Sequence, residues 1–319
     1  MPFDTEIMYH AVQSVLTFFL IGCVGYFLAR KGWFSDDSRK LISKLITEVA
    51  LPVYLVYNVT TELSRDKLAH LAYGVVVPLV SVALNLALGM ALARLLNLPA
   101  NRRGIFSTAM GFSNTIFIGL PINLALFGDE ALPYVLIYYF ANASLFWTYG
   151  NYLLVSDGAA EKTPLFSLAM LKKIFPPPTV GFLLGMLLLL LNIPLPGYLA
   201  NAAKHLGGMT TPLVILSIGV TLFSMGLAKI RFSRDLALII FGRFVISPVI
   251  IMTLIHFFPL PDLMRKVFVI QASLPVMSNI AMLSSYYKSD SEYATVAVSA
   301  TTLLSMLTVP IYMVIVSSM

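Results

Sequence analysis

The chain has 319 residues, of which 58% are hydrophobic and 11% are charged, and its formal net charge is +6. Soluble domains hold roughly 45–50% apolar and about 25% charged residues, so this balance excludes a soluble globular protein. It indicates an integral membrane protein.

Ten apolar runs follow one another along the chain, and each is long enough to cross a bilayer. About 20 helical residues, rising about 1.5 Å each, span ~30 Å of hydrocarbon. The predicted spans are residues 8–29, 39–60, 68–96, 103–127, 131–156, 175–193, 200–228, 235–258, 263–287 and 292–317. We therefore predict an all-α integral membrane protein with ten transmembrane helices.

Lysine and arginine divide unequally between the two sets of connecting loops. The loops that follow the odd-numbered spans hold fifteen of them, whereas the opposite set holds five. Basic residues favour cytoplasmic loops, so this bias predicts a multi-pass protein of the cell inner (plasma) membrane with both termini extracytoplasmic. The positive charge then faces anionic lipid, and no basic groove with interleaved aromatic residues suggests a nucleic-acid partner.

The chain contains a weak internal repeat. Residues 98–106 read L-P-A-N-R-R-G-I-F and residues 260–268 read L-P-D-L-M-R-K-V-F, which share L-P-x-x-x-R-x-x-F at an offset of 162. Two further pairs recur at offsets of 160 and 161, namely Pro52 with Pro212 and Asp129 with Asp290. A recurring offset in three places indicates duplication.

The repeat predicts two five-helix halves, residues 1–156 and 172–319, joined by a cytoplasmic connector, residues 157–171. Because five is odd, the second half enters the membrane from the opposite side. Inverted repeats of this kind are the architecture that secondary transporters use for alternating access.

Two of the predicted spans contain helix-breaking residues at corresponding places. The fourth span holds Gly119 and Pro121 within G-F-S-N-T-I-F-I-G-L-P-I-N, and the ninth holds Pro275. Proline lacks an amide donor, and its ring clashes with the carbonyl four residues earlier. Irregular backbone at membrane depth is tolerated where it is buried in protein or lines a wet cavity. We predict that helices 4 and 9 are broken and cross at the midplane.

The two predicted breaks form a candidate substrate site. Half-helix N-termini carry about half a positive charge and free N–H groups, which suit a carboxylate, whereas free carbonyls at the opposing ends suit a cation. Ordinary proline kinks with polar residues joining helices are the alternative, but paired breaks favour a site. The candidate substrate-binding residues are Asn114, Thr115, Gly119, Pro121, Gln271, Pro275, Ser278 and Asn279, with Ser113 and Ser273 beside them.

Two charged residues within spans have competing interpretations. Arg243 either attracts the substrate carboxylate or bonds carbonyls freed at a break, since an intramembrane arginine costs roughly 2.5–3.5 kcal/mol and needs compensation. Glu48 is either a proton-coupling carboxylate or the partner of Lys44 in an i,i+4 ion pair. Both alternatives stay open from the sequence.

Two smaller features concern partners and metals. Gly181 and Gly185 form a GxxxG pattern, which permits close helix contact either inside the protein or in a homodimer. Cys23 is the only cysteine, so a thiolate cluster is excluded, and the histidines show no metal-ligand spacing. We expect neither a metal site nor a cofactor.

Several motifs resemble those of a known family. N-T-I-F-I-G-L-P (114–121) is similar to the first crossover signature of the auxin efflux carrier family, within the bile/arsenite/riboflavin transporter superfamily, and A-S-L-P (272–275) is similar to its second. The R-F-x-x-x-P pattern that begins at Arg243 also fits. The resemblance covers nearly the whole chain.

The resemblance implies ten helices in a scaffold group and a transport group, with helices 4 and 9 crossing where an organic anion binds. It implies that Asn114, Gly119, Pro121 and Pro275 are crossover residues. The chain lacks the long central loop of plant auxin carriers and looks like a bacterial-type member similar to malonate and malate permeases. It also lacks their second proline after Pro275, so the resemblance does not assign Asn279.

The function predicted from the sequence is a secondary transporter for small organic anions, mono- or dicarboxylates such as malonate, malate or auxin-like acids, working by alternating access. It is not an enzyme, because no span holds a paired aspartate or H-E-x-x-H motif and no histidine lies in the span around Ser113. A sodium- or proton-coupled cation antiporter of similar inverted-repeat fold is the alternative. That class usually needs buried aspartates at the crossing, and the interrupted centres of spans 4 and 9 have none.

Overall fold

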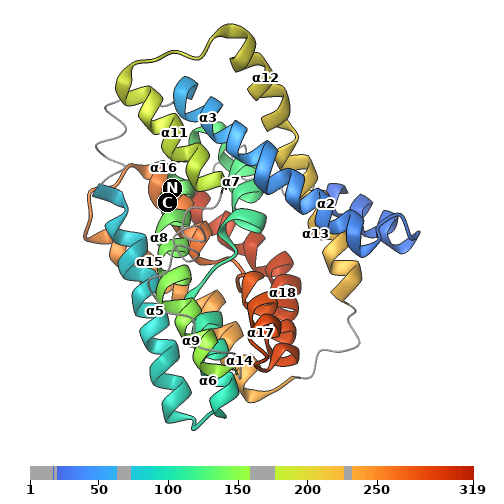
Figure 1. Ribbon diagram of the computed structural model, residues 1–319. Helices are drawn as coiled ribbons and strands as arrows, with labels where there is room; N and C mark the ends of the chain where they lie inside the picture. Colours follow the sequence, from blue (N-terminus) through green and yellow to red (C-terminus); the bar gives the residue numbers. More distant parts are fainter. Residues whose placement is uncertain (1–16, 18–19, 63–72, 159–176, 226–231) are drawn as a thin grey trace. The chain divides into compact units, whose positions relative to one another are not determined.

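The computed structural model describes residues 17, 20–62, 73–158, 177–225 and 232–319 (Figure 1). Every regular element within these residues is helical, and the β-type pairing among them is one isolated bridge. The all-α prediction is thereby confirmed. Of the described helices, those that are long and apolar enough to cross a membrane are Asp37–Thr61, Val76–Leu95, Arg234–His256 and Ser291–Ser317.

The chain forms two compact units, and each draws on both ends of the sequence. Unit 1 comprises residues 1–73, 116–136 and 175–226, and unit 2 comprises residues 74–115, 137–174 and 227–319. Each of the halves predicted from the repeat therefore contributes to both units. The predicted connector 157–171 lies outside the described residues except for its first two.

Unit 1 is built around α3 (Leu51–Glu62). Its other described helices are Leu20–Arg30, α2 (Asp36–Leu45), η1 (Ile46–Ala50), α7 (Leu120–Phe127), η3 (Asp129–Ala131), α11 (Pro177–Leu191), α12 (Gly197–Gly208) and α13 (Thr210–Met225). A Cβ atom added to Gly181 of α11 would lie 2.5 Å from the Pro52 carbonyl oxygen, and one added to Gly185 would lie 2.9 Å from Val59 Cβ. The GxxxG pattern thus serves a close contact between α11 and α3 within one chain.

Unit 2 surrounds α6 (Ala100–Gly111) with α5 (Val76–Leu95) and α9 (Asn151–Asp157), which lie side by side with it (Figure 1). Its remaining helices are η4 (Phe146–Gly150), α14 (Arg234–Phe241), η6 (Gly242–Ile246), α15 (Ser247–His256), α16 (Asp262–Ala272), α17 (Asn279–Tyr286) and α18 (Ser291–Ser317). Two elements, η2 (Thr115–Gly119) and α8 (Leu132–Leu145), begin in one unit and end in the other.

Three prolines near the start of a helix follow a π-helical turn. Pro52, Pro121 and Pro248 each lie two residues beyond the end of a π-helical turn, which is η1, η2 and η6 respectively. Proline cannot donate to the carbonyl four residues earlier and crowds it. A wider turn relieves both problems, so these spans continue as helices through their prolines.

The structure corrects the predicted position of the break in the fourth span. Gly119 and Pro121 lie within continuous helix, because η2 leads directly into α7 and Pro121 occupies its first turn. The helical backbone is instead interrupted before them, at residues 112–114 between α6 and η2. Pro275 does lie in an interruption, residues 273–278 between α16 and α17.

Helices α6 and α16 begin in the same way. Pro99 caps α6 with φ −53° and ψ 146°, and Pro261 caps α16 with φ −55° and ψ 145°. Both prolines belong to the shared L-P-x-x-x-R-x-x-F pattern. The same residues at the same spacing thus produce the same local backbone, an extended proline that starts a short helix ending in an interruption.

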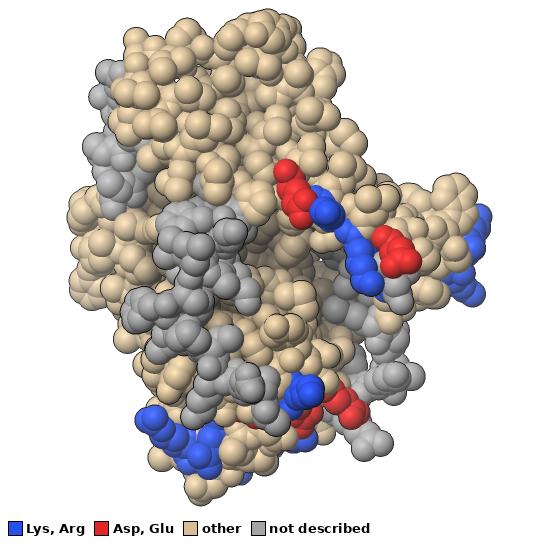
Figure 2. All heavy atoms as spheres, viewed as in Figure 1, with Lys and Arg blue, Asp and Glu red and all other residues tan. Residues whose placement is uncertain are grey.

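Charged side chains occupy restricted parts of the surface. On the face drawn in Figure 2 the described Lys, Arg, Asp and Glu side chains gather in a few small groups, and most of the described surface consists of other residues. Leucine and valine side chains are exposed along α5, α11 and α15 instead, among them Leu84, Leu187 and Val249. An apolar exposed surface on helices of this kind fits a protein whose solvent is the lipid bilayer.

Candidate functional site

The two interruptions of unit 2 pair with each other. Segments 112–114 and 273–278, called here the paired segments, run antiparallel through an isolated bridge between Ser113 and Val276. The Asn114 N–H donates to the Pro275 carbonyl over 2.9 Å, and the Met277 N–H donates to the Phe112 carbonyl over 3.1 Å. Each segment therefore satisfies part of the other's backbone where the helical ladder stops.

Two side chains from other helices complete this backbone. Asn142 of α8 accepts from the Ser113 N–H over 3.2 Å and donates to the Ser113 carbonyl over 3.1 Å. Thr301 of α18 accepts from the Val276 N–H over 3.2 Å. All of these groups are buried, so each bond removes the cost of an unpaired polar group in an apolar setting.

Arg243 holds the ends of both interrupted helices. Its side chain is 0% exposed, and it projects from the π-helical turn η6. The guanidinium donates to the carbonyls of Met110, Ala272 and Leu274 over 2.9–3.2 Å. It also donates to the Ser113 hydroxyl over 2.6 Å.

This arrangement answers the charge problem that the sequence raises. Met110 lies in the last turn of α6, and Ala272 ends α16, so both carbonyls belong to the negative ends of helix dipoles. A cation that bonds both ends is stabilised without a carboxylate partner. Among the ion pairs of the described residues none includes Arg243.

The amino-terminal ends of η2 and α17, which follow the two interruptions, carry neutral polar side chains. Asn114 precedes η2 and is 3% exposed, and its Nδ2 donates to the Ser278 hydroxyl over 2.8 Å. Ser278 and Asn279 begin α17 and are half-buried. The paired segments therefore place two asparagines and a serine at the positive ends of two helices, with the negative ends already occupied by Arg243.

Thr115 and Gln271 lie beside this group. The Gln271 side chain is fully buried, and its Nε2 reaches the Thr115 carbonyl over 3.4 Å. Its Oε1 has no hydrogen-bond partner. Of the predicted site residues, the structure therefore gathers Asn114, Thr115, Gln271, Pro275, Ser278 and Asn279 around the paired segments in unit 2.

The other predicted residues belong to unit 1. Gly119 and Pro121 lie in continuous helix there, as described above. Glu48 forms an ion pair with Lys44 over 3.8 Å, and both side chains are exposed by half or more. This contact confirms the i,i+4 pair that the sequence offers as one explanation of Glu48.

Sequence reasoning did not select Asn142 or Thr301. Both are polar residues in the interior of predicted spans, within F-A-N-A-S and S-A-T-T-L. Intramembrane polar residues are functional or structural candidates by default, and that signal was available. Their distance in sequence from either interruption hides the role, because only the fold brings them to Ser113 and Val276.

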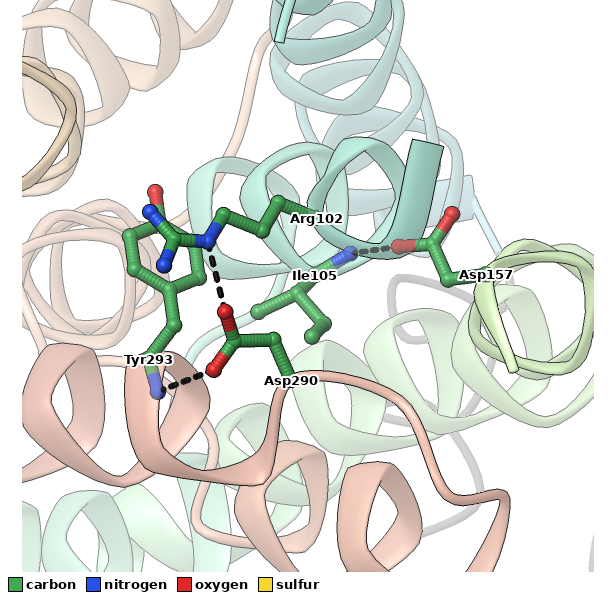
Figure 3. A network of polar contacts seen from close by, with 5 residues as sticks. All are labelled: Arg102, Ile105, Asp157, Asp290 and Tyr293. Carbon is green, nitrogen blue, oxygen red and sulfur yellow. Dashed lines mark hydrogen bonds and ion pairs between the residues drawn. The ribbon is translucent and has the colours of Figure 1, made fainter. Parts of the chain in front are cut away.

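A second polar network lies at the far end of α6. Arg102 donates from Nε to Asp290 over 2.6 Å and stacks on the Tyr293 ring, 4.9 Å from its centroid (Figure 3). Asp290 also accepts from the Tyr293 N–H over 3.0 Å and so caps α18. These contacts attach the start of α6 to the start of α18, while Arg243 attaches its end to α16.

Comparison with known proteins identifies the chain. A family profile described as "Membrane transport protein" matches residues 10–313. The chain belongs to this family. It is the auxin efflux carrier family of membrane transporters, which confirms the resemblance seen in the motifs, and its members are transporters, not enzymes.

Relatives of similar length agree with this assignment. A Methanothermobacter thermautotrophicus protein named "Uncharacterized transporter" is 25% identical over 96% of this chain and 98% of its own length. A Methanocaldococcus jannaschii transporter is 23% identical over 94% of this chain and 97% of its own. A Rhizobium meliloti protein named "Putative malonate transporter" is 26% identical over 92% of each chain. The chain is therefore a multi-pass membrane transporter.

Proposed function

We propose that this transporter is a secondary carrier for small organic anions, mono- or dicarboxylates of the size of malonate. The anion binds at the paired segments, beside Asn114, Thr115, Gln271, Ser278 and Asn279, and the protein exposes this site alternately to the two sides of the membrane. The name of the Rhizobium meliloti relative motivates malonate as the first substrate to test.

The observation that carries this proposal is that Arg243 bonds the carboxyl ends, and not the amino ends, of the interrupted helices. Arg243 occupies the carbonyls of Met110, Ala272 and Leu274, which are the groups that would coordinate a cation. At the positive ends, the Asn114 side-chain amide uses one of its two donors on the Ser278 hydroxyl, and the half-buried Ser278 and Asn279 lie beside it. A site whose helix carbonyl ends are bonded by a guanidinium, and whose positive helix ends carry amide and hydroxyl groups, favours an anion.

The same observation weighs against the alternative, a sodium- or proton-coupled cation antiporter. A cation at the paired segments would approach the buried guanidinium of Arg243 without a carboxylate to offset it. Gln271 Oε1 is an unused acceptor, but a neutral amide oxygen does not offset the charge of the guanidinium. We therefore favour the anion carrier.

The proposal retains the architecture predicted from the sequence. Two inverted five-helix repeats cross at their interrupted fourth and ninth helices, and both termini face away from the cytoplasm in the inner (plasma) membrane. The matching proline caps of α6 and α16 and the matching interruptions after them support the repeat. Pairing of the interruptions supports a crossing.

The test is uptake of radiolabelled malonate into proteoliposomes under set pH and sodium gradients. We expect saturable uptake by the wild type and at least about a tenfold loss with Asn114→Ala, because one hydrogen bond to a charged ligand is worth about 1.5–3 kcal/mol. Asn201→Ala, which changes an exposed asparagine of α12, is the matched control and leaves uptake unchanged.

Malate, pyruvate and indole-acetate are tested alongside malonate. If Asn114→Ala fails to fold, Ser278→Ala removes a half-buried hydroxyl from the same group and replaces it in the assay. Sodium–proton exchange without flux of any carboxylate would overturn the anion proposal in favour of the antiporter.

A further inference from the structure

A separate cleft lies in unit 2 between α5, α6 and α9. It has a volume of about 270 Å³. The polar and charged side chains that line it are Arg94, Arg103, Ser107, Ser156 and Asp157. A space of this size accommodates a small carboxylate with some of its water.

Two arginines make the cleft positive. Arg103 is fixed at its base, because its Nε donates to the Leu98 carbonyl over 2.7 Å, and its terminal nitrogens extend beyond that bond. Arg94 comes from the last turn of α5. The ion pairs of the described residues include neither arginine, so both guanidinium groups are able to bind an anion.

Asp157 is the one acidic group in the lining. It accepts from the Ile105 N–H over 2.9 Å and so joins the end of α9 to α6, on a different side of α6 from Arg102 and Asp290 (Figure 3). The close contact of these helices at Gly104, whose added Cβ would lie 2.3 Å from the Leu153 carbonyl oxygen, holds the carboxyl in place.

The surroundings of Asp157 disfavour its ionised form. Burial raises the pKa of its carboxyl from 3.8 to about 6, although its bonds to the Ile105 and Gly104 amides and the charge of Arg103 act in the opposite direction. Asp157 lies one residue beyond the predicted fifth span, at the end that the arginine bias predicts to be cytoplasmic. The charged groups that line the cleft with it are Arg103 on α6 and Arg94 on α5. Tyr287, which follows α17, packs its backbone against the neighbouring Gly158, and its hydroxyl donates to Asn151.

We propose that this cleft is a second anion site, in which Arg94 and Arg103 bind a small carboxylate and Asp157 takes up one proton from water as the anion enters. The choice of a small carboxylate rests on the proposed function. The cleft then binds the anion at the cytoplasmic end of the carrier, apart from the paired segments. Anion binding there is coupled to protonation of Asp157.

Electrostatics gives the direction of this coupling. An ionised Asp157 repels the entering anion and competes with it for Arg103, whereas a neutral Asp157 does neither and can donate a hydrogen bond to it. Bound anion therefore raises the pKa of the carboxyl further, and by linkage a lower pH strengthens anion binding. At neutral pH most of the free protein carries the ionised form.

The test reads binding at the cleft itself. Ser156→Cys places a thiol in the lining, and Cys23→Ser removes the exposed native thiol. Protection of the introduced thiol from alkylation, measured against malonate concentration, gives the apparent Kd at this site. In this background Asp157→Asn mimics the neutral carboxyl and keeps an acceptor for the Ile105 N–H.

The ratio of the wild-type Kd to the Asp157→Asn Kd is the decisive quantity, since ionisation of malonate cancels in it. With a pKa of about 6, binding to the neutral form alone predicts a ratio of about twofold at pH 6 and about tenfold at pH 7. A ratio that does not change with pH would overturn the coupling to Asp157.

Charge variants test the two arginines. Arg94→Gln and Arg103→Gln each weaken protection about tenfold, as expected for the loss of a charge-assisted bond. Arg234→Gln removes an exposed positive charge from α14 outside the cleft, at the same predicted face, and changes it less than twofold. Equal effects of all three substitutions would mean that protection depends on the overall positive charge of this face, and they would exclude a specific anion site in the cleft.

Uptake assays separate this inference from the proposed function. Saturable malonate uptake without protection of the thiol would overturn the cleft site alone. Protection without uptake of any carboxylate would overturn the proposed function and leave an anion site. Absence of both would overturn both.

Discussion

Replacement of Arg243 by methionine or lysine tests whether this arginine fastens the paired segments or attracts the substrate. Methionine has a similar length and no donors. It leaves the Met110 and Leu274 carbonyls without their guanidinium bonds, whereas the Ala272 carbonyl keeps the Ser247 hydroxyl at 3.0 Å. Lysine keeps the charge but offers one ammonium in place of a planar fork.

The expected cost follows from these contacts. Two buried carbonyls that lose their partners cost about 1–3 kcal/mol each, or about 2–6 kcal/mol together. Removal of a charge from the membrane interior returns roughly 2.5–3.5 kcal/mol. Arg243→Met therefore changes global stability by at most about 3.5 kcal/mol, because the two effects largely offset each other. Arg243→Lys keeps the cost of a charge within the membrane, but a single ammonium cannot bond the separate carbonyls that the planar guanidinium reaches. We therefore expect it to be no better tolerated than methionine.

Hydrogen exchange followed by mass spectrometry locates the effect. We expect the amides of Asn114 and Met277, which join the paired segments, to exchange about tenfold or more faster in both variants, since about 1.4 kcal/mol of local stability corresponds to a factor of ten. Malonate uptake falls in both. If lysine restores uptake while methionine abolishes it, and exchange stays at the wild-type rate in both, Arg243 acts on the substrate and the fastening role is wrong.

Two further substitutions test the packing on which the site depends. Asn142→Ala leaves the Ser113 N–H unpaired, whereas the Ser113 carbonyl keeps the Thr115 N–H at 3.0 Å, so we expect a loss of about 1–3 kcal/mol in unfolding free energy and reduced malonate uptake, with the exposed Asn201→Ala as the control in both assays. Gly181→Ala forces a methyl group to within 2.5 Å of the Pro52 carbonyl oxygen, so thermal unfolding in detergent should show a loss of about 1–3 kcal/mol. Gly208→Ala adds the same methyl where no atom lies within 4 Å and should be neutral; equal melting temperatures for both glycine variants would contradict the close contact of α11 with α3.

The sequence by itself determined the class of protein and the family. Apolar runs of bilayer length and the clustering of charge between them follow from the cost of burying polar groups in lipid, so composition suffices to read them. The polar residues Asn114, Gln271, Ser278 and Asn279 were recognisable because polar side chains are rare within such runs. The repeated L-P-x-x-x-R-x-x-F pattern located the two helices that carry them.

Only the tertiary structure decided where the backbone stops being helical and what satisfies it there. From the sequence, Pro121 is the expected position of the break, but a π-helical turn accommodates it. The wider turn relieves the clash with the carbonyl four residues earlier and does not require the N–H that proline lacks. The actual interruption at 112–114 contains no proline and is stable because residues 273–278, Asn142 and Arg243 supply its partners. Those partners are distant in sequence, and a hydrogen bond between distant residues leaves no local pattern to read.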